Sequence, residues 1–159
     1  ITMHRPSNVD SAKNFNKSVD MLNSMSEKIK VVFPIHPRTK NKLRNSNIKL
    51  CDNILLLEPL PYLEFLGLMA KAKVVVTDSG GIQEETTYLG VQCITIRENT
   101  ERPVTVDLGT NHLVVTDSGL VLNVFNTIIN GELKKGIIPP KWDGKTGGRI
   151  AKIIKDFLL

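Results

Sequence analysis

Short apolar runs alternate along this chain with segments in which apolar residues recur at helical spacing. The runs are β-branched or aliphatic and predict strands at residues 1–3, 31–35, 54–57, 74–77, 92–96 and 113–115. The helical repeats lie at residues 12–25, 62–70, 82–89, 120–129 and 149–159. Strands that alternate with helices across short polar connections predict an α/β fold, a doubly wound parallel sheet with helices on both faces. We expect residues 1–159 to form one domain.

One segment, residues 74–89, combines a buried strand, a tight turn and the start of a helix. The valines at 74–76 suit a strand covered on both faces, and Ser79-Gly80-Gly81 permits a sharp turn. The first turn of a helix presents unpaired N–H groups and the positive end of its dipole. Glycines let a phosphate approach, and Ser79 adds a hydroxyl donor. The segment predicts a diphosphate site, although these residues could also form only a turn.

Glu85 extends this prediction from a phosphate to a nucleotide. It follows Gly81 by four residues, so it lies on the same helix face about one turn, roughly 5 to 6 Å, further along. A carboxylate at that distance can accept hydrogen bonds from a ribose diol while the amides hold the phosphates. The alternative is that Glu84 and Glu85 only favour the start of the helix.

Four polar loops follow predicted strands, and the carboxyl ends of the strands form the rim where doubly wound sheets bind ligands. His4 and Arg5 could meet the diphosphate there, or His4 could be satisfied by a loop carbonyl. His36 could line the same rim or belong to a solvated basic loop. Arg102 could close on the ligand or pair with a neighbour at a helix start. The four loops are His4-Arg5, His36-Pro37-Arg38, Asp78-Ser79-Gly80-Gly81 and residues 97–102.

Composition narrows the class of protein. The chain is 41% hydrophobic and 23% charged, which suits one globular core, and its net charge of +5 is spread out, with few aromatic residues. This balance favours a small anionic ligand over a nucleic acid. Cys51 and Cys93 are predicted to be free core thiols in a reducing compartment. No apolar run is long enough to span a membrane, so we expect a cytoplasmic protein.

Several common site patterns are absent from the sequence. It has no Cys/His spacing typical of metal sites, no glycine fingerprint of nicotinamide enzymes and no P-loop lysine after the glycines. We therefore expect neither a metal nor another cofactor. A sugar-nucleotide site remains as the prediction.

The two ends of the chain suggest a piece of a longer protein. Ile1 begins in what resembles the middle of a strand. After Pro139-Pro140, a carboxyl-terminal helix is predicted at about residues 146–159, with its regular part beyond Gly148 because glycine costs about 1 kcal/mol in a helix interior. Its apolar residues lie on one face and must be buried on the sheet or on a missing partner domain.

Five motifs together resemble the non-hydrolysing UDP-N-acetylglucosamine 2-epimerases. They occur in the order of that family and cover the whole chain. The resemblance covers only the carboxyl-terminal domain of the family's two-domain GT-B fold. This domain is the Rossmann-like half that binds UDP. The motifs are residues 4–9, His36-Pro37-Arg38-Thr39, residues 77–85, residues 97–103 and Trp142-Asp143-Gly144-Lys145.

The resemblance implies reversible conversion of UDP-N-acetylglucosamine to UDP-N-acetylmannosamine, by elimination and re-addition of UDP, for polysaccharide synthesis. His4 would assist departure of UDP and is the predicted catalytic residue. The acid and base for the sugar would lie in the missing amino-terminal domain, so this chain would bind UDP without turnover. The full-length protein would be a homodimer. The predicted substrate-binding residues are Arg5, His36, Ser79, Gly80, Gly81, Glu85 and Arg102.

Two other functions stay open for the same residues. A glycosyltransferase of the GT-B fold would also place a glutamate on ribose and a helix on diphosphate, although the Thr100-Glu101-Arg102-Pro103 loop argues against it. A non-catalytic nucleotide-sugar binding module is the other alternative. Pro6-Ser7 replaces the Arg-Glu pair found in many epimerases, which puts their allosteric response in question here.

Overall fold

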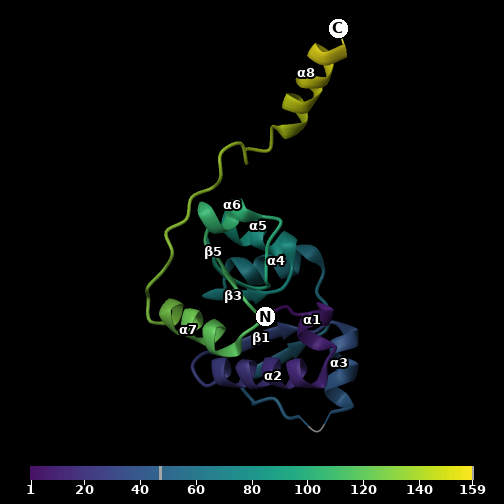
Figure 1. Cartoon of the computed structure of the whole chain (residues 1–159), viewed down its shortest axis with the longest axis vertical. Helices are drawn as coiled ribbons and strands as arrows, with labels where there is room; N and C mark the ends of the chain where they lie inside the picture. Colours follow the sequence, from purple (N-terminus) through teal and green to yellow (C-terminus); the bar gives the residue numbers. More distant parts are fainter. Residues whose placement is uncertain (47, 159) are drawn as a thin grey trace.

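The computed structural model describes residues 1–46 and 48–158, which form an α/β body with a projecting carboxyl-terminal helix (Figure 1). All six predicted strand regions are extended, and the basic segment after residue 36 is a helix. The elements are α1 Pro6–Val9, α2 Ala12–Ser26, β1 Val31–Pro34, α3 Pro37–Arg44, β2 Ile54–Leu57, α4 Tyr62–Ala70, β3 Val74–Thr77, α5 Gly80–Leu89, β4 Gln92–Ile96, α6 Pro103–Asp107, β5 Asn111–Val114, α7 Ser118–Ile129 and α8 Thr146–Leu158.

The strands are parallel and follow the order of a doubly wound sheet. β1 pairs with β2, and β3, β4 and β5 pair in that order. Thr2 bridges Thr77, and the Ile1 ammonium donates to the Val32 carbonyl at 2.8 Å, so the first residues lie between β1 and β3. The spatial order is therefore β2, β1, residues 1–3, β3, β4, β5, and the chain reverses direction across the sheet at β3. Ligands bind at this switch point in such folds.

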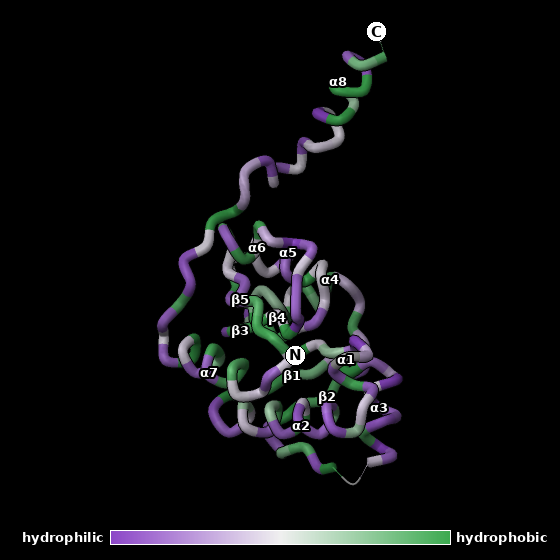
Figure 2. Tube along the Cα trace, viewed as in Figure 1, coloured by the Kyte–Doolittle hydropathy of each residue, from purple (hydrophilic) through white to green (hydrophobic). Residues whose placement is uncertain are grey.

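Consecutive valines of β3 pack on opposite faces of the sheet. Val76 belongs to the main core with Leu22 of α2 and Phe125 of α7. Val75 packs instead with Met69 of α4 in a separate cluster. In Figure 2 the strands are mostly hydrophobic and lie between two groups of helices that carry hydrophilic stretches. Helices therefore cover both faces, as the period of two along a strand requires.

The two cysteines differ, and the prediction of two core thiols is wrong for one of them. Cys93 in β4 is fully buried, and this burial raises the pKa of its thiol to about 11. Cys51 is exposed. It lies before β2 in a turn, where its backbone N–H donates to Asn23 Oδ1 at 2.9 Å, so the apolar run begins only after it.

The last helix covers Thr146–Leu158, within the predicted range of about 146–159, and packs on nothing in the described chain. Helix α8 starts at Thr146 and includes both glycines, because Arg149 bonds to Asp143 and to Thr146 Oγ1 across its first turn. None of its described residues is buried, and it projects from the body (Figure 1). It does not lie on its own sheet. No helix among the described residues has the length and hydrophobicity needed to cross a membrane.

Candidate functional site

The turn between β3 and α5 opens a helix at the switch point of the sheet. Ser79 is the N-cap residue, with an extended backbone, and its side chain makes no capping hydrogen bond. Gly80 and Gly81 form the first helical positions. A Cβ on Gly81 would meet nothing within 4 Å, so the backbone there is open to a ligand. The first-turn amides and the Ser79 hydroxyl can therefore serve as donors to an anion.

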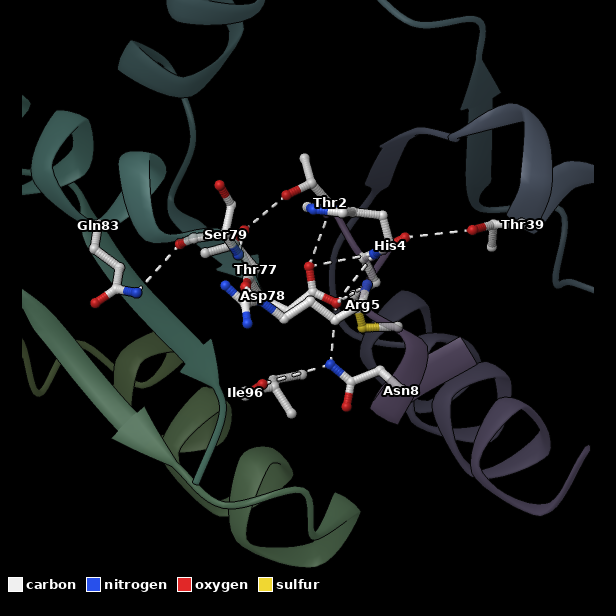
Figure 3. A network of polar contacts seen from close by, with 11 residues as sticks. Thr2, His4, Arg5, Asn8, Thr39, Thr77, Asp78, Ser79, Gln83 and Ile96 are labelled. Carbon is white, nitrogen blue, oxygen red and sulfur yellow. Dashed lines mark hydrogen bonds and ion pairs between the residues drawn. The ribbon is translucent and has the colours of Figure 1, made fainter. Parts of the chain in front are cut away.

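Asp78 holds the His4-Arg5 loop against this turn (Figure 3). Its carboxylate is fully buried and accepts from the backbone N–H of His4 at 3.0 Å, from that of Arg5 at 2.9 Å and from Asn8 Nδ2 at 3.0 Å. The Arg5 Nε donates back to the Asp78 carbonyl at 2.8 Å. Two loops more than seventy residues apart in the sequence are thus fixed to each other.

The His4 imidazole also faces Asp78. Its Nδ1 lies 3.2 Å from Asp78 Oδ1, and its side chain is 49% exposed. This contact favours a proton on Nδ1, which leaves Nε2 for the open side of the site. His36 lies across the same space, with its ring centroid 6.5 Å from that of His4. As the N-cap of α3 its Nδ1 accepts from the Arg38 backbone N–H at 3.2 Å, which favours a proton on Nε2.

These histidines and Ser79 share one pocket at the carboxyl ends of the strands, which we call the histidine pocket. Its volume is about 220 Å³, below the range of roughly 300 to 1,000 Å³ that encloses most small ligands. A second surface that faces the pocket would therefore be needed to enclose a ligand of that size. Its walls are Thr2, Met3, His4, Pro34, His36, Pro59, Leu60, Phe65, Ser79 and Ile82.

Glu85 lies in a neighbouring hollow, one helical turn after Gly81. The negative charge of Glu85 raises the pKa of the exposed Tyr62 hydroxyl. Polar and aromatic groups therefore meet beside the phosphate turn without sharing the histidine pocket. The hollow is lined by Tyr62, Leu66, Glu84, Glu85, Tyr88, Leu89 and Trp142.

Arg102 is placed at the start of α6 and pairs with Glu84, with Arg102 Nε 3.1 Å from Glu84 Oε2. This is the helix-start ion pair that the sequence left open as an alternative. Both side chains remain partly exposed, and Arg102 lines neither the histidine pocket nor the Glu85 hollow. A contact with ligand stays a prediction for this residue.

Sequence reasoning missed the residues that hold the site together. Gln83 is fully buried and joins Ser79 O to Thr100 Oγ1 and Asn111 Nδ2. Asp78 offered a clue, because a carboxylate directly before a phosphate turn would repel the ligand unless backbone donors engaged it. The contacts of Gln83 are long-range and have no local pattern. In residues 1–46 and 48–158 no group of three His, Cys, Asp or Glu side chains is arranged to hold a metal.

The strand order and the glycine turn at the switch point define a Rossmann-like α/β domain, half of a GT-B fold. A sequence profile for UDP-N-acetylglucosamine 2-epimerase matches residues 1–155. The chain belongs to this family. It spans about 43% of the length of the two curated relatives described next.

Two archaeal relatives are UDP-N-acetylglucosamine 2-epimerases. The protein of Methanococcus maripaludis is 41% identical over 160 positions, which cover 97% of this chain and 43% of the relative. That of Methanocaldococcus jannaschii is 40% identical, with the same coverage.

Solved structures agree with these relatives. The crystal structure of the Methanocaldococcus jannaschii enzyme with UDP-GlcNAc and UDP superimposes with a TM-score of 0.83 at 39% identity, over 97% of this chain and 44% of that one. The Neisseria meningitidis enzyme bound to UDP-GlcNAc gives a TM-score of 0.82 at 27% identity, over 98% and 43%. Both similarities extend along almost the whole of the present chain.

Proposed function

We propose that this chain is the UDP-binding half of a UDP-N-acetylglucosamine 2-epimerase. The observation that carries the proposal is the Ser79-Gly80-Gly81 turn at the start of α5, placed beside His4 by Asp78 at the switch point of the sheet. The similarity to an enzyme crystallised with UDP-GlcNAc and UDP supports the same ligand here. The diphosphate would accept from the first-turn amides and the Ser79 hydroxyl, with Arg5 beside it.

The nucleoside would extend along α5 from the phosphates. Glu85 is one turn further along this helix and would accept hydrogen bonds from the ribose hydroxyls. Arg102 would bind the phosphates by giving up its ion pair with Glu84. His36 would form the wall opposite His4, at the centroid distance of 6.5 Å between the two rings.

In the proposed reaction, a base removes the proton at C2 of the sugar and the C1–O bond to UDP breaks, leaving an unsaturated sugar. Re-addition of UDP, with a proton delivered to the other face of C2, gives the epimer. In its imidazolium form, with Nδ1–H facing Asp78, His4 can donate the Nε2 proton to the leaving oxygen and take that proton back when UDP re-adds to the sugar. Because UDP must stay bound while it is detached from the sugar, binding by this half is essential to the cycle.

The base and acid for C2 belong to the other half of the proposed enzyme, so we expect this chain to bind without turnover. The open histidine pocket is suited to closure by that half. Helix α8 carries uncovered Ile153, Ile154 and Phe157 and is the proposed element that crosses to it. We also propose a cytoplasmic, homodimeric full-length enzyme, on the basis of the family resemblance.

Titration calorimetry with UDP tests the binding proposal. We expect the chain to bind UDP and Glu85→Gln to bind it about tenfold more weakly, because two ribose hydrogen bonds to a charged acceptor are weakened. Glu132→Gln is the matched control, since Glu132 is exposed after α7 and its substitution makes the same change in net charge. Equal affinity of the two variants would contradict the assignment of Glu85. C2 epimerisation by the full-length protein, and none by this chain, tests the division of roles.

A further inference from the structure

The start of α5 already holds a carboxylate of the protein itself. A Cβ on Gly80 would lie 2.3 Å from Glu101 Oε1, so this carboxylate packs directly on the backbone of the first helical residue. Glu101 comes from the loop between β4 and α6. The pKa of Glu101 is lowered, first by a hydrogen bond from its own backbone N–H and then by Arg97 and Arg5. A negative charge therefore lies where the helix attracts an anion.

Arg97, directly after β4, reaches the same point. Its Nη1 lies 2.7 Å from Glu101 Oε2 and 3.9 Å from the position of a Cβ on Gly80. The Arg97 side chain is 12% exposed. Within the described parts of the chain, the buried Nη1 atom finds no acceptor with hydrogen-bond geometry, although it faces this carboxylate. A buried guanidinium nitrogen with unused donors is costly to leave, and its position suits a further anionic oxygen.

We propose that Arg97 is a further diphosphate-binding residue, and that Glu101 occupies the phosphate position in the free chain until the ligand displaces it. This inference rests on the proposed function, since the ligand that displaces Glu101 is the diphosphate of UDP. Arg97 exchanges the Glu101 carboxylate for phosphate oxygens, so its positive charge stays paired with a negative one. Glu101 is 46% exposed and can turn to solvent. The exchange disfavours weak anions, because they must compete with a carboxylate tethered to the site.

The test is a titration of the chain with UDP and, separately, with inorganic pyrophosphate. Glu101→Gln is nearly isosteric but neutral, so both ligands should bind about three- to tenfold more tightly once the competing charge is gone. Glu132→Gln removes the same charge from an exposed position after α7, away from the site, and should leave both affinities within twofold of the starting protein. Arg97→Met should weaken both ligands about tenfold or more, whereas Arg97→Lys should retain part of the binding.

A merely structural role of Arg97 is separated by the double variant Arg97→Met with Glu101→Gln. In this variant neither side chain is left as an unpaired charge, and circular dichroism checks that it folds. It should still bind pyrophosphate more weakly than Glu101→Gln alone. Recovery of full Glu101→Gln affinity in this variant would overturn the role of Arg97. Equal or weaker binding by Glu101→Gln relative to Glu132→Gln would overturn the role of Glu101.

The two ligands distinguish failure of this inference from failure of the proposed function. If UDP binds and Glu85→Gln weakens its binding, but Glu101→Gln behaves as Glu132→Gln does, the UDP site stands and the exchange is overturned. If pyrophosphate responds to Arg97 and Glu101 as predicted but UDP binds no better than pyrophosphate, the exchange stands and the nucleotide assignment fails. If neither ligand binds any folded variant, both are overturned.

Discussion

The turn between β3 and α5 and the helix α8 have equally clear sequence patterns but opposite environments. The β3–α5 turn is surrounded by packed strands, and its Asp78 carboxylate is fully buried with several donors. In α8 no described residue is buried, although isoleucines recur along one face. The comparison teaches that periodicity predicts an element and its apolar face, whereas the partner of that face depends on contacts that the pattern does not contain.

Two phenylalanines give the largest expected contrast between these regions. Phe125 in α7 is 2% exposed and Phe157 in α8 is 87% exposed. Phe125→Ala should lower the free energy of unfolding by about 3 to 5 kcal/mol, because it leaves a cavity in the main core. Phe157→Ala should change it by less than about 0.5 kcal/mol. Urea denaturation followed by circular dichroism measures both, and a comparable loss for Phe157→Ala would show that α8 is packed in solution.

Two aspartates give the second contrast. Asp78→Ala leaves buried donors of His4, Arg5 and Asn8 without their acceptor, so we expect a loss of about 3 kcal/mol in the free energy of unfolding. Asp156→Ala in the exposed α8 should be nearly neutral. The same denaturation experiment compares them. Unchanged stability in Asp78→Ala would remove the physical basis for the placement of the His4 loop.

The amino group of Ile1 makes stability depend on pH in a preparation that starts at this residue. Burial lowers its pKa from 8.0 to about 5. Between these values the unfolded state binds more protons, so stability should rise with pH, by about 3 kcal/mol from pH 5.5 to pH 8. The pKa of His112 is also lowered by burial, which acts in the same direction. Acetylation of the amino group should flatten the profile, and an identical slope after acetylation would contradict this origin.

A glycine in α8 gives the smallest expected effect. Gly148→Ala should stabilise the helical state of α8 by up to about 1 kcal/mol and so raise its helix content, because alanine loses less backbone entropy. The global unfolding midpoint should not move, since α8 is not packed on the body. Far-ultraviolet circular dichroism and a urea titration separate the two quantities. A shift of the global midpoint would mean that α8 and the sheet unfold as one unit.

The fold could be predicted to a large extent because its determinants are local. The valines at 74–76, the glycines after Ser79 and the alternation of strand and helix specify the doubly wound sheet before any tertiary contact is known. Helix α8 was predicted at about residues 146–159, but its two glycines are helical because Arg149 and Asp143 stabilise a turn that the glycines alone disfavour. Cys51 was misplaced because a neighbouring apolar run does not say where the strand begins.

The grouping of His4, His36 and Ser79 was predictable from the sequence, and the interactions around them were less so. His4, His36 and Ser79 meet in one pocket because the ends of parallel strands share a rim. The contact of Asp78 with His4, and the contact of Glu101 with Gly80, join segments that no local spacing relates. Pairing of Arg102 with Glu84 likewise depends on the distance between α5 and α6, which the sequence does not encode locally.

The central claim is that UDP binds at the start of α5, and backbone amide chemical shifts test it most directly. A titration of the isotopically labelled chain with UDP should shift the amide signals of Ser79, Gly80, Gly81, His4 and Arg5, while the signals of α8 stay in place. Shifts that are absent at the α5 turn, or concentrated in another part of the chain, would contradict the account.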